Sequence, residues 1–217
     1  MASPANEAMR QAWDGPEGAN WSELAEGFER ASTEHRLVLL RAAALAPGED
    51  VLDLGCGNGA LALEAGAAVA PGQVVGIDLS SAMLANGRSR AAAAGRSNVS
   101  FVHADAQVHA FEPASFDVVV SNAGAMFFDD QDAAFTNLRS ALKPGGRLVY
   151  ATCSVLPDEN EAIVDAFVGA HPEFTFGDAA AELLRSGVAL DTGRTLKLST
   201  ARHGCDGFFA AVLERSA

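Results

Sequence analysis

Three acidic residues could together bind a cationic, hydroxyl-bearing ligand. Asp53 lies directly ahead of a glycine-rich segment, and Asp78 and Asp105 each follow a short apolar segment. Short segments rich in Val and Ile are typical of buried strands, and the carboxyl ends of parallel strands meet at one edge of a sheet. Carboxylates accept hydrogen bonds from hydroxyl and amino groups and attract cations. The three acids therefore predict one polar site at that edge.

The glycine-rich segment 55–59 follows the first of these strands and precedes a helix expected near Ala60. Glycines let the backbone approach a ligand where a Cβ would clash, and a helix N-terminus offers unpaired N–H groups. Gly55, Gly57 and Ala60 also satisfy the GxGxxA form of a dinucleotide-binding turn, with Asp78 in the place of the ribose-binding acid. A nicotinamide-dependent oxidoreductase is therefore one alternative.

Asp53 distinguishes the two kinds of ligand. It places a carboxylate two residues before the first glycine, where a dinucleotide would bring its negatively charged pyrophosphate. S-adenosylmethionine (SAM) has no phosphate and carries a sulfonium and an α-ammonium, which a carboxylate attracts. We therefore expect SAM, with Asp78 bound to the ribose hydroxyls and Asp105 to the adenine amino group.

These motifs resemble the class I methyltransferases, and most of all the bacterial small-molecule enzymes of ubiquinone and menaquinone biosynthesis. The resemblance covers residues 12–150 and rests on WDGPEG, VLDLGCGNG, GIDLSSAML, HADAQ, SFDVVVSNAGAMFF and NLRSALKPGGRLVY. It implies methyl transfer to a small-molecule acceptor. The donor site that it implies has Asp53, Gly55 and Gly57 around the methionine portion, Asp78 on ribose, Leu79 and Met83 against adenine, Asp105 and Ala106 at the adenine edge, and Ser121 beside the donor.

Residues 150–217 resemble a different family, the Sun/Fmu ribosomal RNA cytosine-5 methyltransferases. The matching stretches are YATCSVLPDENE and RHGCDGFFAAVL. In that family the Cys of the ATCS motif attacks carbon 6 of cytosine, and Cys153 occupies its position. The family's second cysteine, after the fourth strand, has no counterpart in SNAGAM at 121–126. We therefore interpret the chain as a hybrid, natural or constructed, with an idle Cys153, and keep an rRNA cytosine-5 methyltransferase as an alternative.

The order of apolar and helical segments from Asp50 onward predicts an α/β fold. We expect a Rossmann-like, doubly wound sheet of about seven strands, mostly parallel, with one antiparallel strand supplied by a C-terminal hairpin. The expected strands are Val51–Leu54, Val74–Ile77, Val99–Val102, Phe116–Val120, Arg147–Thr152 and the hairpin pair Thr195–Ser199 and Phe208–Leu213. The expected helices begin near Ala60, after the Ser80 cap and near Asp130, and another runs from Pro157 to Ala170.

The length of 217 residues predicts a single domain. Residues 1–49 are expected to form a helical cap around Trp13, Trp21 and Phe28. Residues 50–152 would form the cofactor-binding core, and residues 153–217 the helices and hairpin that complete the sheet.

Composition excludes several other classes of protein. The formal net charge of −13 disfavours nucleic acid as a partner. Cys56, Cys153 and Cys205 lie too far apart for a disulfide framework or a zinc site, so we expect free thiols and no metal. No apolar segment approaches the roughly 20 residues of a membrane helix, and the N-terminus lacks the pattern of a secretory signal. We expect a cytoplasmic monomer or homodimer.

No general base stands out in the sequence. His109 and Cys153 are the candidates for a catalytic role, although an acceptor that is already nucleophilic needs little acid–base help, because proximity and orientation can carry the reaction. The last alternative is a hybrid that binds the donor without turnover.

Overall fold

One mixed sheet organises the protein in the computed structural model, which describes residues 5–185, 187–190, 192–204 and 207–216. Its eight strands are β1 (Val51–Leu54), β2 (Val74–Asp78), β3 (Val99–His103), β4 (Phe116–Asn122), β5 (Leu142–Thr152), β6 (Phe174–Phe176), β7 (Thr195–Leu198) and β8 (Phe208–Arg215). Their order is β3-β2-β1-β4-β5-β8-β6, and β7 also pairs with β8. Strands β1 to β5 are parallel to one another.

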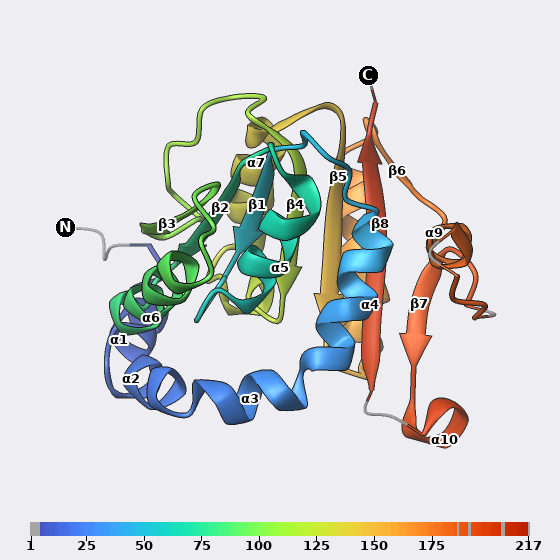
Figure 1. The fold of residues 1–217 in the computed structure, drawn as a ribbon. Helices are drawn as coiled ribbons and strands as arrows, with labels where there is room; N and C mark the ends of the chain where they lie inside the picture. Colours follow the sequence, from blue (N-terminus) through green and yellow to red (C-terminus); the bar gives the residue numbers. More distant parts are fainter. Residues whose placement is uncertain (1–4, 186, 191, 205–206, 217) are drawn as a thin grey trace.

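Helices cover both faces of this sheet (Figure 1). They are α1 (Glu7–Trp13), α2 (Pro16–Glu23), α3 (Ala25–Ala31), α4 (Thr33–Ala43), α5 (Ala60–Val69), α6 (Ser81–Ala93), α7 (Gln131–Ala141), α8 (Glu161–Ala170), α9 (Ala179–Arg185) and α10 (Thr200–His203), with 3-10 turns η1 (Ala125–Phe127) and η2 (Pro157–Glu159). Side chains of α4, α5, α6 and α9 belong to the core on one face, and those of α7 and α8 to the core on the other. All four residues of β1 are buried, as expected for a parallel strand covered on both sides.

Strand β8 is the reversed strand of the sheet. It runs antiparallel to β5, with Thr152 opposite Phe209, and antiparallel to both β6 and β7 on its other side. The predicted pairing of the last two extended segments is therefore confirmed, as is the mostly parallel α/β sheet. The connection between β7 and β8 contains the short helix α10. Strand β6 was not expected.

The predicted helix starts are confirmed where a side chain caps the helix. Ser80 Oγ accepts a hydrogen bond from the Met83 N–H at the start of α6. Asp130 Oδ1 does the same for the Ala133 N–H at the start of α7, at 2.9 Å. Both bonds satisfy N–H groups that have no partner within the helix.

Two element boundaries differ from the sequence prediction. The helix expected from Pro157 to Ala170 is interrupted at Asn160, whose φ of −119° and ψ of −96° are not helical. The Asn160 Oδ1 accepts a hydrogen bond from Thr152 Oγ1 at 2.5 Å, and its Nδ2 donates one to the Ser154 carbonyl at 2.9 Å. The side chain therefore stabilises the break between η2 and α8. Strand β5 begins directly after α7, because Leu142 already pairs with Phe116 ahead of a shift in register.

The N-terminal helices α1 to α3 form an arc along the edge where the parallel strands end (Figure 1). Side-chain and backbone contacts fasten this arc to α6. Asp14 Oδ1 accepts a hydrogen bond from the Ser81 N–H at 2.8 Å, and Ser22 Oγ donates to the Ala82 carbonyl at 3.3 Å. Gly18 comes so close that an added Cβ would lie 2.3 Å from Ser80 Oγ. The arc is therefore docked on the segment that follows β2.

Candidate functional site

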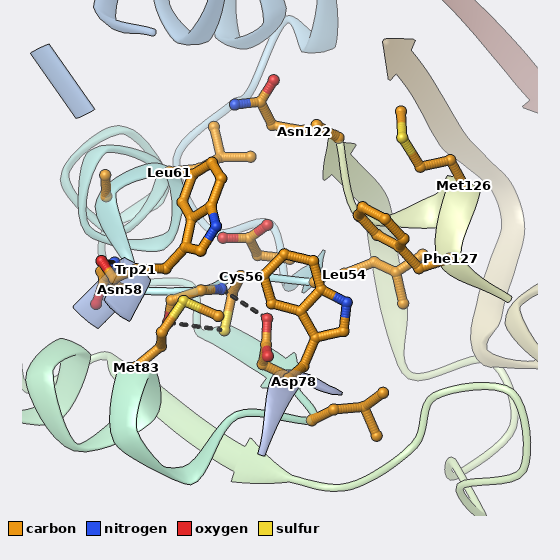
Figure 2. Close-up of a pocket in the computed structure, with 18 of the residues that line it drawn as sticks. Trp21, Leu54, Cys56, Asn58, Leu61, Asp78, Met83, Asn122, Met126 and Phe127 are labelled. Carbon is orange, nitrogen blue, oxygen red and sulfur yellow. Dashed lines mark hydrogen bonds between the residues drawn. The ribbon is translucent and has the colours of Figure 1, made fainter. Parts of the chain in front are cut away.

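A cavity of about 760 Å³ opens at the carboxyl ends of β1, β2 and β4 (Figure 2). Its wall combines the turns that follow these strands with side chains from α2, α3 and α4. This is the edge at which open α/β sheets bind ligands. The volume lies in the range of small-molecule sites, roughly 300–1,000 Å³.

The glycine-rich turn after β1 lies against the turn after β4. Gly55 has a φ of +65°, and a Cβ built on it would lie 2.7 Å from the Gly124 Cα. Gly57 has a φ of +52°. Only glycine adopts such angles without strain, and only glycine permits this close approach of two backbones. Both turns thereby bring bare backbone to the cavity.

Asp78, at the end of β2, is fixed by the turns on either side of it. Its Oδ2 accepts a hydrogen bond from the Gly57 N–H at 2.8 Å, and its Oδ1 accepts one from the Ser80 N–H at 2.8 Å. Figure 2 shows this carboxylate beneath the open cavity. Each carboxylate oxygen has further acceptor capacity, so two hydroxyl groups of a ligand can bind an already oriented carboxylate.

Four buried oxygens in the cavity wall have no hydrogen-bond partner within the described structure. They are Asn6 Oδ1, Asp53 Oδ2, Asp105 Oδ2 and Asn122 Oδ1. A buried polar atom left unsatisfied costs free energy, so such atoms call for a ligand group that donates hydrogen bonds. SAM offers an amino group at its adenine end and an ammonium with a sulfonium at its methionine end. Asp105 and Asp53 therefore fit the two ends of this donor.

The pKa of Asp53 follows from its position. Burial, and then the nearby Asp78 carboxylate, raise it to about 8. Burial also raises the pKa of Asp78, although backbone N–H groups act in the other direction. A bound cation would favour the ionised form of both acids.

Aromatic side chains surround the entrance of the cavity. We call Trp13, Trp21, Phe28 and Phe127 the aromatic mouth. Trp21 stacks on Phe28 with ring centroids 3.8 Å apart, and Trp13 meets Phe127 edge to face at 5.1 Å. Trp21 and Phe127 keep 38% and 36% of their surface exposed, and Figure 2 shows them entering from two sides of the cavity. A flat apolar ligand fits such a surface.

Asn58 connects the aromatic mouth to the glycine-rich turn. Its Nδ2 donates to the Trp21 carbonyl at 3.2 Å, and its Oδ1 accepts from Asn86 Nδ2 at 3.1 Å. Asn86 also reaches the Ser22 carbonyl at 3.4 Å. The N-terminal arc and the turn after β1 are thus joined by side-chain amides.

Most of the predicted donor-site residues line this one cavity. They are Asp53, Gly55, Gly57, Asp78, Leu79, Met83, Asp105 and Ala106. Ser121 is not among the described residues of the wall. Its Oγ donates to the Leu54 carbonyl at 3.0 Å and accepts from the Ala125 N–H at 3.1 Å, so it joins β4 to β1 and η1 instead. Asn122, Ala123 and Gly124 form the wall at that point.

The two catalytic candidates from the sequence lie in different places. His109 is absent from the described wall and packs edge to face on Phe111 at 4.7 Å. Cys153, at the end of β5, is exposed and belongs to the wall. Cys56 also lies there, but burial raises the pKa of its thiol well above the usual value, which makes it a poor nucleophile. Cys205 lies outside the described residues.

The sequence did not point to three charged or ionisable wall residues, Glu29, His35 and Arg36. Arg36 is only 7% exposed, and its guanidinium pairs with Glu64 at 3.0 Å. Glu29 pairs with Arg90. These residues come from α3 and α4, far in sequence from the strand-end motifs. An amphipathic helical pattern alone does not show which of its polar residues will face a ligand.

Within the described ranges, no group of three or more His, Cys, Asp or Glu side chains is arranged to hold a metal ion. None of the helices formed by those residues is long and apolar enough to cross a membrane.

A family model for a methyltransferase domain matches residues 45–182. The chain belongs to this family. The match confirms the predicted class I SAM-dependent methyltransferase, and with it the cofactor, in preference to the nicotinamide-dependent alternative. It also extends beyond Tyr150, across the point where we placed the junction between two resemblances. The hybrid origin and the relation to the Sun/Fmu family therefore stay hypotheses.

Individual relatives are similar over part of their length. Nocamycin O-methyltransferase of Saccharothrix syringae is 40% identical over 103 residues, which cover 47% of this chain and 37% of that protein. A demethylmenaquinone methyltransferase of Clavibacter sepedonicus is 34% identical over 151 residues, 66% of this chain and 60% of that protein. The chain thus spans less than two thirds of the length of these relatives.

The fold recurs in a solved structure whose length is similar. The [4+2]-cyclase SpnF superposes with a TM-score of 0.72, covering 100% of this chain and 99% of that chain, at 18% identity. An identity this low shows a shared fold and carries no statement about the reaction.

Proposed function

We propose that this chain transfers the methyl group of SAM to a small-molecule acceptor bound at the aromatic mouth. The observation that carries the proposal is the pair of unpartnered buried oxygens, Asp53 Oδ2 and Asp105 Oδ2, in the same cavity as a glycine-rich turn. The family to which the chain belongs supplies the reaction class.

The donor would lie along the ends of β1, β2 and β3. Asp78 would accept hydrogen bonds from both ribose hydroxyls, and Asp105 would accept one from the adenine amino group beside Ala106. Leu79 and Met83 would contact the adenine ring. Asp53, with the bare backbone of Gly55 and Gly57, would hold the methionine portion.

Bound SAM supplies an electrophilic methyl group on its sulfonium. The chain itself contributes orientation and the exclusion of water. The two glycine turns approach each other in the cavity wall, and the aromatic mouth lies at its entrance. Holding two reactants in line replaces an encounter in solution by a unimolecular step, which alone can lower the barrier by about 7–11 kcal/mol.

A small apolar acceptor suits the mouth better than a nucleic acid does. The chain carries 28 acidic and 15 basic residues, which repels a phosphate backbone. Two relatives are named for small acceptors, nocamycin and demethylmenaquinone. The cytoplasmic location and the monomeric or homodimeric state expected from the sequence are predictions of the same kind.

Native mass spectrometry of the purified protein tests donor binding directly, by looking for co-purified SAM or S-adenosylhomocysteine (SAH). Calorimetry with SAH should give a micromolar Kd, and NADH should not bind. Binding of NADH without SAH would overturn the proposal. Donor binding with no turnover across a broad panel of acceptors would instead favour the alternative of a hybrid without activity.

A further inference from the structure

We propose that His35 accepts the proton of a hydroxyl group on the acceptor during methyl transfer. This inference rests on the proposed function. His35 lies in α4 and lines the cavity, and it is the one imidazole among the described residues of the wall. A side chain that accepts a proton must reach the reacting group, and imidazole is the side chain most often used for this task near neutral pH.

The strand order places His35 at the end of the cavity away from the adenine acids. Asp78 and Asp105 follow β2 and β3, whereas His35 stacks on Phe208 at the start of β8. Because β8 runs antiparallel to β5, its first residues share an edge with the carboxyl ends of the parallel strands. His35 therefore lies on the other side of β1 from Asp78 and Asp105, the side that we assign to the acceptor.

The ring of His35 packs against the ring of Phe208. The two ring centroids are 5.0 Å apart and the rings are nearly parallel, at 6°. Phe208 is itself fixed in the core, with 1% of its surface exposed. A proton acceptor that packs on a fixed ring needs little rearrangement in the transition state.

Asn122 gives independent evidence that a polar group of the acceptor belongs at this end. It ends β4, lines the cavity, and its buried Oδ1 has no hydrogen-bond partner within the described structure. Because this oxygen has no partner, it can accept a hydrogen bond from a ligand without breaking an existing hydrogen bond. The acceptor end is thus apolar at the mouth and polar beside Asn122.

The charges of the wall favour a neutral hydroxyl group over an anionic acceptor. A bound cationic donor favours the ionised, negatively charged form of Asp53 and Asp78. The guanidinium of Arg36 is occupied by Glu64 and by the Glu29 carbonyl. Among the described wall residues, no other Lys or Arg is present to bind a carboxylate or phosphate. A neutral hydroxyl is a weak nucleophile until its proton is removed. The geometry therefore points to planar phenols or enols.

In the proposed step, His35 takes the hydroxyl proton on its imidazole nitrogen as the oxygen forms a bond to the methyl carbon. The bond between that carbon and the sulfonium breaks, and its electron pair stays on sulfur as a neutral thioether. The imidazolium then returns its proton to solvent. The step needs no oxidant, reductant or metal.

The test compares His35→Gln with the matched control His171→Gln. His171 also packs against a phenylalanine, Phe167, at 4.6 Å, but it is absent from the described wall. SAH formation is measured from SAM with a panel of neutral planar phenols that includes 1-naphthol. We expect His35→Gln to lower kcat roughly 100- to 10,000-fold at neutral pH. The deficit should shrink at alkaline pH, where the phenol ionises unaided, and His171→Gln should match wild type.

Two further measurements keep the result interpretable. Calorimetry with SAH should give His35→Gln the wild-type Kd within about twofold, which shows that the variant is folded. In histidine-labelled, SAH-bound protein, 1-naphthol should shift one imidazole NMR signal that is missing from His35→Gln. Wild-type protein that binds SAM but methylates no phenol, or a His35→Gln variant with wild-type kcat, would overturn the inference alone. Wild-type protein that does not bind SAM would overturn the proposed function instead.

Discussion

The two ends of the cavity are built differently. At the ends of β1 to β3, the wall is fixed by hydrogen bonds to the backbone and by the close approach of Gly55 to Gly124. Beside β4, β5 and β8, the wall consists of side chains from helices that are distant in the sequence. In the first part Asp78 is fixed by the Gly57 and Ser80 N–H groups. In the second, His35 packs on the ring of Phe208. A backbone-built site tolerates little change, but a side-chain surface can be altered one residue at a time. The same donor site can therefore be combined with binding surfaces for many different acceptors.

The largest effect is expected from Gly55→Ala. The new Cβ would meet Gly124 at 2.7 Å with φ at +65°, so the two turns must separate. Overpacking of this kind costs about 1–3 kcal/mol, and we expect a lower melting temperature together with roughly 100-fold weaker binding of SAH. The control is Gly27→Ala in α3, where nothing lies within 4 Å of the new Cβ. Equal affinities of Gly55→Ala and Gly27→Ala for SAH, measured by calorimetry, would contradict the inference that backbone contacts shape this part of the cavity.

Asp78→Ala should have the next largest effect. Hydrogen bonds to a charged group contribute about 1.5–3 kcal/mol, so their loss should weaken SAH binding roughly tenfold or more. Asp158→Ala, at an exposed acid outside the described wall, should leave the affinity unchanged. Unchanged affinity in Asp78→Ala itself, measured by calorimetry, would contradict the assignment of this residue to the ribose.

Asp53 should make donor binding depend on pH. Because its pKa is raised to about 8, the carboxyl is largely protonated at pH 6 in the absence of donor, and the affinity for SAM should rise as pH approaches 8. Asp53→Asn should flatten this slope. Asp117→Asn is the control and should leave the slope unchanged. Burial raises the pKa of Asp117, but the hydrogen bonds from the Asp50 N–H and the Lys143 ammonium lower it by more, so Asp117 is ionised throughout this pH range.

Asp53→Asn should also raise the stability of the donor-free protein. A carboxyl pKa that is higher in the folded than in the unfolded chain means that the folded state binds the additional proton between the two values. Stability therefore falls as pH rises from about 4 to about 8. At pH 8, Asp53→Asn should melt at a higher temperature than wild type while binding SAM less well. A lower melting temperature for Asp53→Asn than for wild type would show that the Asp53 carboxyl group does not destabilise the donor-free protein.

The smallest effect is expected from Cys153→Ser. The side chain lies in the wall on the acceptor side, but the acids that follow β5 would repel a phosphate backbone. We expect unchanged SAH binding, and no methylation of ribosomal RNA by wild type. Transfer of radiolabelled methyl to unmodified small-subunit RNA, abolished by this one substitution, would favour the rRNA alternative.

The donor side could be predicted from the sequence because its signals are local. Asp53, Asp78 and Asp105 each end a recognisable apolar strand, and strand ends converge in any parallel sheet. His35 could not be found in this way, because its place is set by contact with Phe208, which only the complete sheet brings near. Ser121 is the opposite case. It has the sequence position of a ligand contact, but both hydrogen-bonding roles of its hydroxyl are used by the backbone.

The position of β8 has a consequence for how the chain is made. Strands β6 and β7 precede β8 in the sequence, yet both reach the sheet only through it, since β8 lies between them and β5. During synthesis, β1 to β5 can pair as they leave the ribosome, while β6 and β7 must wait for residues 208–215. The edge of β5 is left unpaired in the meantime and is open to association with another nascent chain.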